Sequence, residues 1–174
     1  EINDDLRSEQ KMFRLLQGDV GSGKTIVALT SILNVINSKF QVAFMAPTEI
    51  LAQQHYNLAK SLLPDNVKID ILTSKTDNKI RKKIINDLEN HQIDLLIGTH
   101  SLFQNKINYR KLGLIIIDEQ HKFGVKQRKR LSDKGGKNCD ILVMSATPIP
   151  RTMIMTIFGD MDVSIIKSKP KNRK

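Results

Sequence analysis

The sequence predicts an α/β fold in which a mostly parallel sheet carries helices on both faces. Short apolar runs alternate with longer stretches whose apolar residues recur at helical spacing, as in parallel strands joined by helical crossovers. The chain has 174 residues, 40% of them hydrophobic, which is enough for one domain with its own core. Glycine-rich and polar segments follow several of the apolar runs, where sheets of this class bind ligands.

Seven apolar runs predict the strands of this sheet. The run 112–117 is the most apolar, so it suits the middle of the sheet, where both faces of a strand are covered. In chain order, the strands are predicted over 13–16, 42–45, 67–72, 94–97, 112–117, 141–144 and 163–166.

Helical periodicity predicts four helices between these strands, over 25–37, 48–63, 78–89 and 150–158. The first should turn one apolar stripe toward the sheet, formed by Ile26, Leu29, Leu33 and Ile36. Thr48 is a natural N-cap for the second, with Glu49 in its first turn. The third is polar and basic.

The chain carries a formal net charge of +10, with cations gathered in the segments 79–83, 122–137 and 167–174. Such an excess favours an anionic partner, and nucleic acid first, although a lysine-rich composition of the whole proteome would also produce it. No run approaches the roughly 18 apolar residues of a membrane span, and the chain starts with acidic and polar residues, so we expect a cytoplasmic protein. Cys139 is alone, which excludes an internal disulfide.

The segment 18–25 fits the phosphate-binding pattern G-x-x-x-x-G-K-[ST] and lies between a predicted strand and a predicted helix. Its glycines allow a tight turn, so that backbone N–H groups at a helix N-terminus face a polyphosphate. Lys24 would reach the β- and γ-phosphates, and the Thr25 hydroxyl would bind Mg²⁺. The alternative is a glycine-rich turn without a ligand. The candidate nucleotide-binding residues are Gly18, Asp19, Val20, Gly21, Ser22, Gly23, Lys24 and Thr25.

The apolar run 114–117 delivers two acidic residues at its end, in the form of a Walker B element. Asp118 would hold Mg²⁺ together with Thr25, and Glu119 would polarise the attacking water. Acidic residues after a strand are also common at helix N-termini, but the phosphate loop elsewhere in the chain favours the functional interpretation. The two motifs together predict metal-assisted hydrolysis of a nucleoside triphosphate.

An ordered series of segments resembles the motif set of superfamily 2 helicases, and among these the RecG-type family. The segments are 17–25, 46–55, 98–102, 118–125 and 145–152, and the resemblance extends from about residue 13 to residue 166. It implies the first RecA-like P-loop NTPase domain of a motor that uses ATP and Mg²⁺. The implied partner is DNA, as branched, fork or Holliday-like junctions, in recombination and repair.

The resemblance also implies roles for individual residues. The DNA backbone would be contacted by Pro47, Thr48, Glu49, Gly98, Thr99 and His100. Gln120 and His121 would join the catalytic residues Lys24, Asp118 and Glu119 and act on the γ-phosphate. The nucleotide state would pass to the DNA surface through Ser145, Ala146 and Thr147. Taken alone, His55, His91 and His100 are interpreted as ordinary polar residues.

The expected organisation is a motor domain over 1–166 and a basic linker over 167–174 that leads to a second RecA-like domain. Since that domain would supply arginines to the γ-phosphate, the chain alone is expected to have negligible ATPase activity. A monomer is also expected. The nearest alternative is the motor of a transcription-repair coupling factor, but Ser22 and Gln120 favour the RecG type. A non-catalytic nucleotide-binding scaffold is the other alternative.

Overall fold

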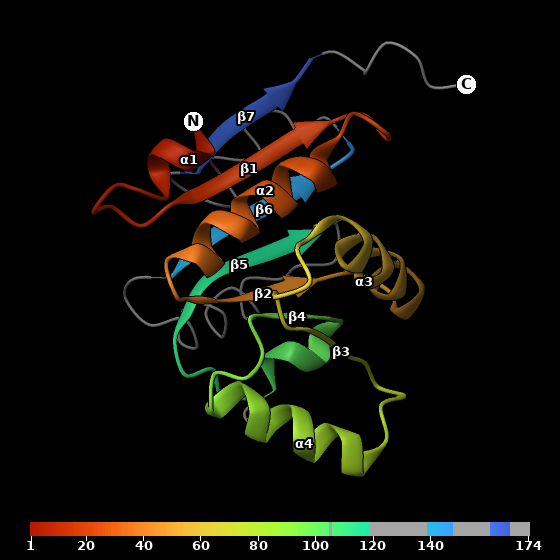
Figure 1. Ribbon diagram of the computed structural model, residues 1–174. Helices are drawn as coiled ribbons and strands as arrows, with labels where there is room; N and C mark the ends of the chain where they lie inside the picture. The colour runs from red at the N-terminus through yellow and green to blue at the C-terminus, as the bar shows by residue number, and fades with distance from the viewer. Residues whose placement is uncertain (105, 119–138, 148–160, 168–174) are drawn as a thin grey trace.

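The computed structural model describes residues 1–104, 106–118, 139–147 and 161–167, and these form a seven-stranded sheet covered by helices (Figure 1). The strand order is β3-β4-β2-β5-β6-β1-β7, and all six neighbouring pairs are parallel. In chain order, the strands are β1 Phe13–Gly18, β2 Gln41–Met45, β3 Ile69–Leu72, β4 Leu95–Gly98, β5 Leu112–Asp118, β6 Asp140–Ser145 and β7 Asp162–Ile166. The predicted fold class is confirmed.

Helices cover both faces of the sheet, as predicted. The helices are α1 Ile2–Asp5, α2 Lys24–Asn37, α3 Glu49–Leu62 and α4 Asn78–Glu89, and a 3₁₀ helix η1 spans His100–Phe103. Buried residues of α2 and α3 belong to one apolar cluster, whereas those of α4 belong to the cluster on the other face. Among the described residues, no helix combines the length and apolar character needed to cross a membrane.

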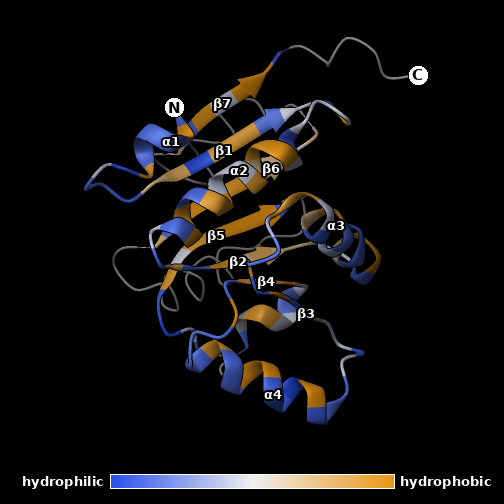
Figure 2. Ribbon diagram, in the orientation of Figure 1, coloured by the Kyte–Doolittle hydropathy of each residue, from blue (hydrophilic) through white to orange (hydrophobic). Residues whose placement is uncertain are grey.

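Strand β5 lies in the middle of the sheet, as its apolar sequence predicts (Figure 2). Its side chains alternate between the two apolar clusters: Leu114 and Ile116 pack on the α2–α3 face, and Ile115 and Ile117 on the α4 face. Because both faces are covered, the whole strand must be apolar until it reaches the edge of the sheet.

The predicted inward face of α2 is partly wrong. Ile26 is 51% exposed, whereas Ala28, Ile32 and Val35 are buried. These buried residues follow the i, i+4, i+7 spacing of one helical stripe, and Ile26 lies about 200° around the helix from Ala28. The short α1 and η1 were not predicted, and the helix predicted over 150–158 lies outside the described residues.

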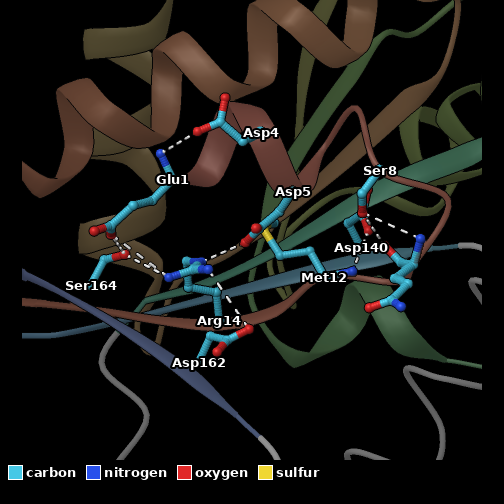
Figure 3. A network of polar contacts seen from close by, with 10 residues as sticks. Glu1, Asp4, Asp5, Ser8, Met12, Arg14, Asp140, Asp162 and Ser164 are labelled. Atoms are coloured by element: carbon cyan, nitrogen blue, oxygen red, sulfur yellow. Dashed lines mark hydrogen bonds and ion pairs between the residues drawn. The ribbon is translucent and has the colours of Figure 1, made fainter.

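A buried arginine ties the N-terminal segment to the edge strand β7 (Figure 3). Arg14 in β1 is about 10% exposed and donates from Nε to Asp5 Oδ2 at 2.6 Å and from Nη1 to Ser164 Oγ at 2.9 Å. Carboxylate oxygens of Glu1 and Asp162 each lie 3.7 Å from the guanidinium. One planar group therefore connects three segments of the chain.

Replacing Arg14 by alanine should lower the free energy of unfolding by about 2–3 kcal/mol. The change leaves the polar partners of Arg14 without their hydrogen bonds and removes the packed aliphatic part of the side chain. Urea unfolding measures this change. The exposed Arg110 offers the matched control, because Arg110→Ala should change the midpoint little. Equal midpoints for the Arg14→Ala variant and the wild type would show that the network adds no stability.

Candidate nucleotide-binding site

The predicted motifs meet at one edge of the sheet, formed by the carboxyl ends of the strands. Strand β6 lies between β1 and β5, and the register pairs Gln17 with Ser145 and Met144 with Asp118. The phosphate loop follows β1, Asp118 ends β5, and the 145–147 segment follows β6. Residues far apart in the sequence therefore share one edge, because parallel strands all point to it.

The phosphate loop has the backbone conformation that its glycines permit. Gly21 and Gly23 adopt φ values of 79° and 99°, in the left-handed region where other residues are strained. Gly23 is the N-cap of α2, and because it has no side chain, no capping group occupies the first N–H groups of the helix. A fourteen-residue helix thus directs its positive dipole end at this loop. The N–H groups of Lys24 and Thr25 precede the first helical hydrogen bonds, which Ile26 and Val27 donate to the Gly23 carbonyl oxygen.

The Lys24 side chain of the loop fits an anionic ligand. Lys24 Nζ donates to the carbonyl oxygens of Gly18 at 2.5 Å and Asp19 at 3.0 Å, so its ammonium lies across the loop. The hydroxyl of Ser22 is buried and has no hydrogen-bond partner in the described parts of the chain. Thr25, the predicted metal-binding hydroxyl, lies in the first turn of α2 and is half-buried. The loop therefore suits a polyphosphate.

Asp118, the predicted metal-binding carboxylate, lies at the carboxyl end of β5 and is largely buried. Its Oδ2 is 2.8 Å from Nε2 of His55, a residue of α3. The three candidates Glu119, Gln120 and His121 lie outside the described residues. No group of three or more His, Cys, Asp or Glu side chains in the described ranges could hold a metal by itself. Mg²⁺ is suited to such a site, since it binds one or two protein oxygens together with substrate phosphates.

The predicted coupling segment folds back on itself and contacts β1. The Ser145 and Thr147 hydroxyls lie 3.2 Å apart, and Ser145 Oγ accepts from the Thr147 N–H at 3.2 Å. Ala146 lies between them. Gln17 Nε2 donates to the Thr147 carbonyl oxygen at 3.0 Å, which connects this segment to the residue that precedes the phosphate loop. No role was predicted for Gln17, although a polar residue at the end of a buried strand was a usable signal.

The predicted DNA-contacting residues follow β2 and β4, next to the nucleotide motifs at the same edge. Pro47 precedes Thr48, which is the N-cap of α3 as predicted and accepts from the Leu51 N–H at 3.2 Å. The carboxylate of Glu49 accepts from the Ser74 N–H at 3.1 Å and lies 3.3 Å from Lys75 Nζ. Hydrogen bonds from Ser74, then Lys75, hold the pKa of Glu49 below its usual value. The Glu49 carboxylate thus holds the loop after β3.

The second predicted DNA segment is closely packed. Gly98 ends β4 beside Leu72 of β3, and the Ser101 hydroxyl donates to the Leu72 carbonyl oxygen at 3.0 Å. Thr99 is the N-cap of η1, and His100 is its exposed first residue. The loops after β2, β3 and β4 are therefore held next to one another.

A cavity of about 610 Å³ lies at the amino ends of the strands, on the side of the sheet away from the predicted motifs. It is lined by residues near the starts of strands, such as Phe40, Gly113 and Asp140, by the end of α2, and by Asn3 and residues 6–11. It is separate from the predicted motifs, which lie at the carboxyl ends of the strands.

A family model described as DEAD/DEAH box helicase matches residues 3–156. Two curated relatives are named ATP-dependent DNA helicase RecG: the Thermotoga maritima protein, 52% identical over 175 residues, and the Bacillus subtilis protein, 50% identical over 175 residues. Both alignments cover 100% of this chain but only 22% and 26% of the relatives, so the chain spans about a quarter of their length.

Solved structures agree with this family. A structure of RecG bound to a three-way DNA junction matches with a TM-score of 0.83 and 47% identity, covering 100% of this chain and 23% of that one. A DEAD box protein from Methanococcus jannaschii matches with a TM-score of 0.70 and 22% identity, covering 95% of this chain and 47% of that one, which shows the shared fold. The chain therefore belongs to the DEAD/DEAH box helicase family, and the RecG proteins are the members to which these comparisons liken it.

Proposed function

We propose that this chain is the first RecA-like motor domain of a helicase that hydrolyses ATP to remodel branched DNA. The observation that carries the proposal is the meeting of the phosphate loop, Asp118 and the 145–147 segment at one edge of the sheet. Curated relatives carry the name of an ATP-dependent DNA helicase. The proposed domain covers 1–166, and the basic residues after it are proposed to lead to a second RecA-like domain.

The chain's residues would bind and orient the nucleotide. The N–H groups of the phosphate loop and the Lys24 ammonium would hold the β- and γ-phosphates, whose charge they offset. Thr25 and Asp118 would hold Mg²⁺, which neutralises charge on the phosphate oxygens when it is bound. Glu119 would orient the attacking water and accept its proton, with Gln120 and His121 beside the γ-phosphate.

The loops after β2, β3 and β4 would hold the DNA backbone. Segments 47–49 and 98–100 follow β2 and β4, and the loop after β3, the strand next to β4, presents the cation Lys75, 86% exposed. Arg81 anchors this loop by donating from Nη2 to the Thr73 carbonyl oxygen at 2.8 Å. Exposed cations and backbone N–H groups give affinity for phosphates without reading sequence. The RecG structure with a three-way junction supports branched DNA as the substrate class.

Replacing Glu119 by glutamine in the full-length protein tests the proposal. DNA-stimulated hydrolysis should fall by about 10²–10⁴-fold, because an amide cannot accept the proton of the water. Binding of labelled ATP should stay within about twofold, since the charge on the phosphate loop is unchanged. Glu89→Gln, at the end of α4, is the control and should hydrolyse ATP like the wild type. Undiminished turnover in the Glu119→Gln variant would contradict a motor of this kind.

A further inference from the structure

His55 connects α3, the helix after the predicted DNA-contacting residues 47–49, to Asp118, the predicted metal-binding carboxylate. It lies in the second turn of α3, the helix that follows β2, and it reaches the end of β5, the strand that pairs with β2. An ionised carboxylate only accepts hydrogen bonds, so the Nε2–H of His55 donates to Asp118 Oδ2, at 2.8 Å. Both side chains are 11% exposed, which shields this contact from water.

The imidazole of His55 is held on a second side by Phe44. The two ring centroids are 4.6 Å apart with an interplanar angle of 31°, and Phe44 is fully buried in β2. Because β2 pairs with β5, the ring and the carboxylate rest on adjacent strands of one rigid sheet. The imidazole therefore has little freedom to rotate, and it fixes the plane of the Asp118 carboxylate.

In the described parts of the chain, the other oxygen of Asp118 has no hydrogen-bond partner. His55 is the one hydrogen-bond partner of the Asp118 side chain within the described residues. An aspartate that holds Mg²⁺ through a water molecule needs one oxygen at a fixed position, and hydrogen bonds to the other oxygen provide that. The hydrogen bond from His55 thus suits a carboxylate that binds a metal, because it holds the carboxylate in one orientation.

The same helix begins at the proposed DNA surface. Thr48 and Glu49 lie at the start of α3, less than two turns before His55, and Glu49 pins that start to the loop after β3. A helix moves as a unit, so a small displacement at its first turn displaces the His55 ring. The hydrogen bond between His55 and Asp118 passes this displacement to the Asp118 carboxylate.

We propose that His55 is a positioning residue that couples DNA binding at the start of α3 to the affinity of the Asp118 site for Mg²⁺–nucleotide. The inference rests on the proposed function and deepens it. Coupling of this kind is reciprocal: DNA raises the affinity for Mg²⁺–nucleotide by the same factor by which Mg²⁺–nucleotide raises the affinity for DNA. Typical coupling factors are about 5–150-fold.

The test measures the affinity of the full-length protein for labelled ADP, in Mg²⁺ and in EDTA, with and without a single-stranded oligonucleotide. His55→Leu keeps the bulk of the ring but cannot donate, so the gain in affinity from Mg²⁺ should fall about 10-fold or more, and the effect of DNA should shrink toward none. His55→Gln, whose amide reaches nearly as far as Nε2, should retain most of both. Affinity in EDTA should stay within about twofold for both variants, because the phosphate loop is intact.

A double-mutant cycle separates positioning from a merely structural role. In an Asp118→Ala background, His55→Leu should cause no further loss, because the residue acts through that carboxylate. His91→Asn is the matched histidine control: His91 lies after α4 and its φ of 56° is tolerated by asparagine. Thermal melts verify folding, and should His55→Leu fail to fold, His55→Asn, whose shorter amide cannot reach Asp118, carries the same test.

The inference is overturned when His55→Leu retains the full Mg²⁺ gain and the full effect of DNA. Additive losses in the cycle with Asp118→Ala would overturn it as well. Other results would contradict the proposed function. If the wild type binds no Mg²⁺–nucleotide, or if the Lys24→Ala variant binds it equally well, both the proposed function and the role of His55 are wrong. If Lys24→Ala loses binding but His55→Leu keeps the Mg²⁺ gain and the effect of DNA, only the role of His55 is wrong.

Discussion

Replacing Lys24 by alanine is expected to weaken binding of Mg²⁺–ATP by about 10- to 150-fold. The ammonium lies across the phosphate loop, held by the Gly18 and Asp19 carbonyl oxygens, where it would meet the β- and γ-phosphates. A hydrogen bond to a charged group contributes about 1.5–3 kcal/mol, which corresponds to this range of affinity. A fluorescence titration with labelled ATP measures the change.

The control for Lys24 is a lysine on another element. Lys82 is exposed on α4, and Lys82→Ala removes the same charge from the surface without touching the phosphate loop. Its affinity for labelled ATP should stay within about twofold of the wild type, because screened surface charges act weakly at a distance. Equal losses in both variants would show that Lys24 acts only through the net charge.

Replacing Gly98 by alanine is expected to lower the free energy of unfolding by about 3 kcal/mol or more. A Cβ atom at this position would lie 2.0 Å from the Leu72 carbonyl oxygen and 2.9 Å from Leu102 Cδ2. Leu72 is the partner of Gly98 in the β3–β4 ladder, so its backbone has no room to withdraw without breaking the sheet. Urea unfolding followed by circular dichroism measures the loss.

Gly23 supplies the matched glycine for that experiment. A Cβ there would meet nothing within 4 Å, but φ is 99°, so Gly23→Ala should cost only the backbone strain, about 1–2 kcal/mol. Gly98→Ala should therefore be clearly less stable than Gly23→Ala. A stability of Gly98→Ala equal to that of the wild type would contradict a close approach of β3 and β4 at this point.

The fold was predictable because its signals are local. The apolar run that became β5 could only lie in the middle of a sheet, and the N-cap Thr48 marked the start of α3 correctly. The phosphate loop was recognisable from eight consecutive residues. Since parallel strands direct their carboxyl ends to one edge, the position of the site followed from the order of strands and motifs.

The contacts that connect the motifs were not predictable, because they depend on which strands are neighbours. His55 was interpreted as an ordinary polar residue, yet it contacts Asp118, 63 residues away, through the adjacency of β2 and β5. Gln17 contacts Thr147 across 130 residues for the same kind of reason. Arg14 did give a signal, since a charged residue inside an apolar strand requires partners.

The central claim is that the phosphate loop and Asp118 form one pocket for Mg²⁺–nucleotide. A crystal structure of the full-length protein with Mg²⁺ and a non-hydrolysable ATP analogue tests it most directly. The claim predicts phosphates on the N–H groups of residues 21–25, beside the Lys24 ammonium, with the ion between Thr25 and Asp118. Phosphates found instead in the cavity beside Asp140, at the other edge of the sheet, would contradict it.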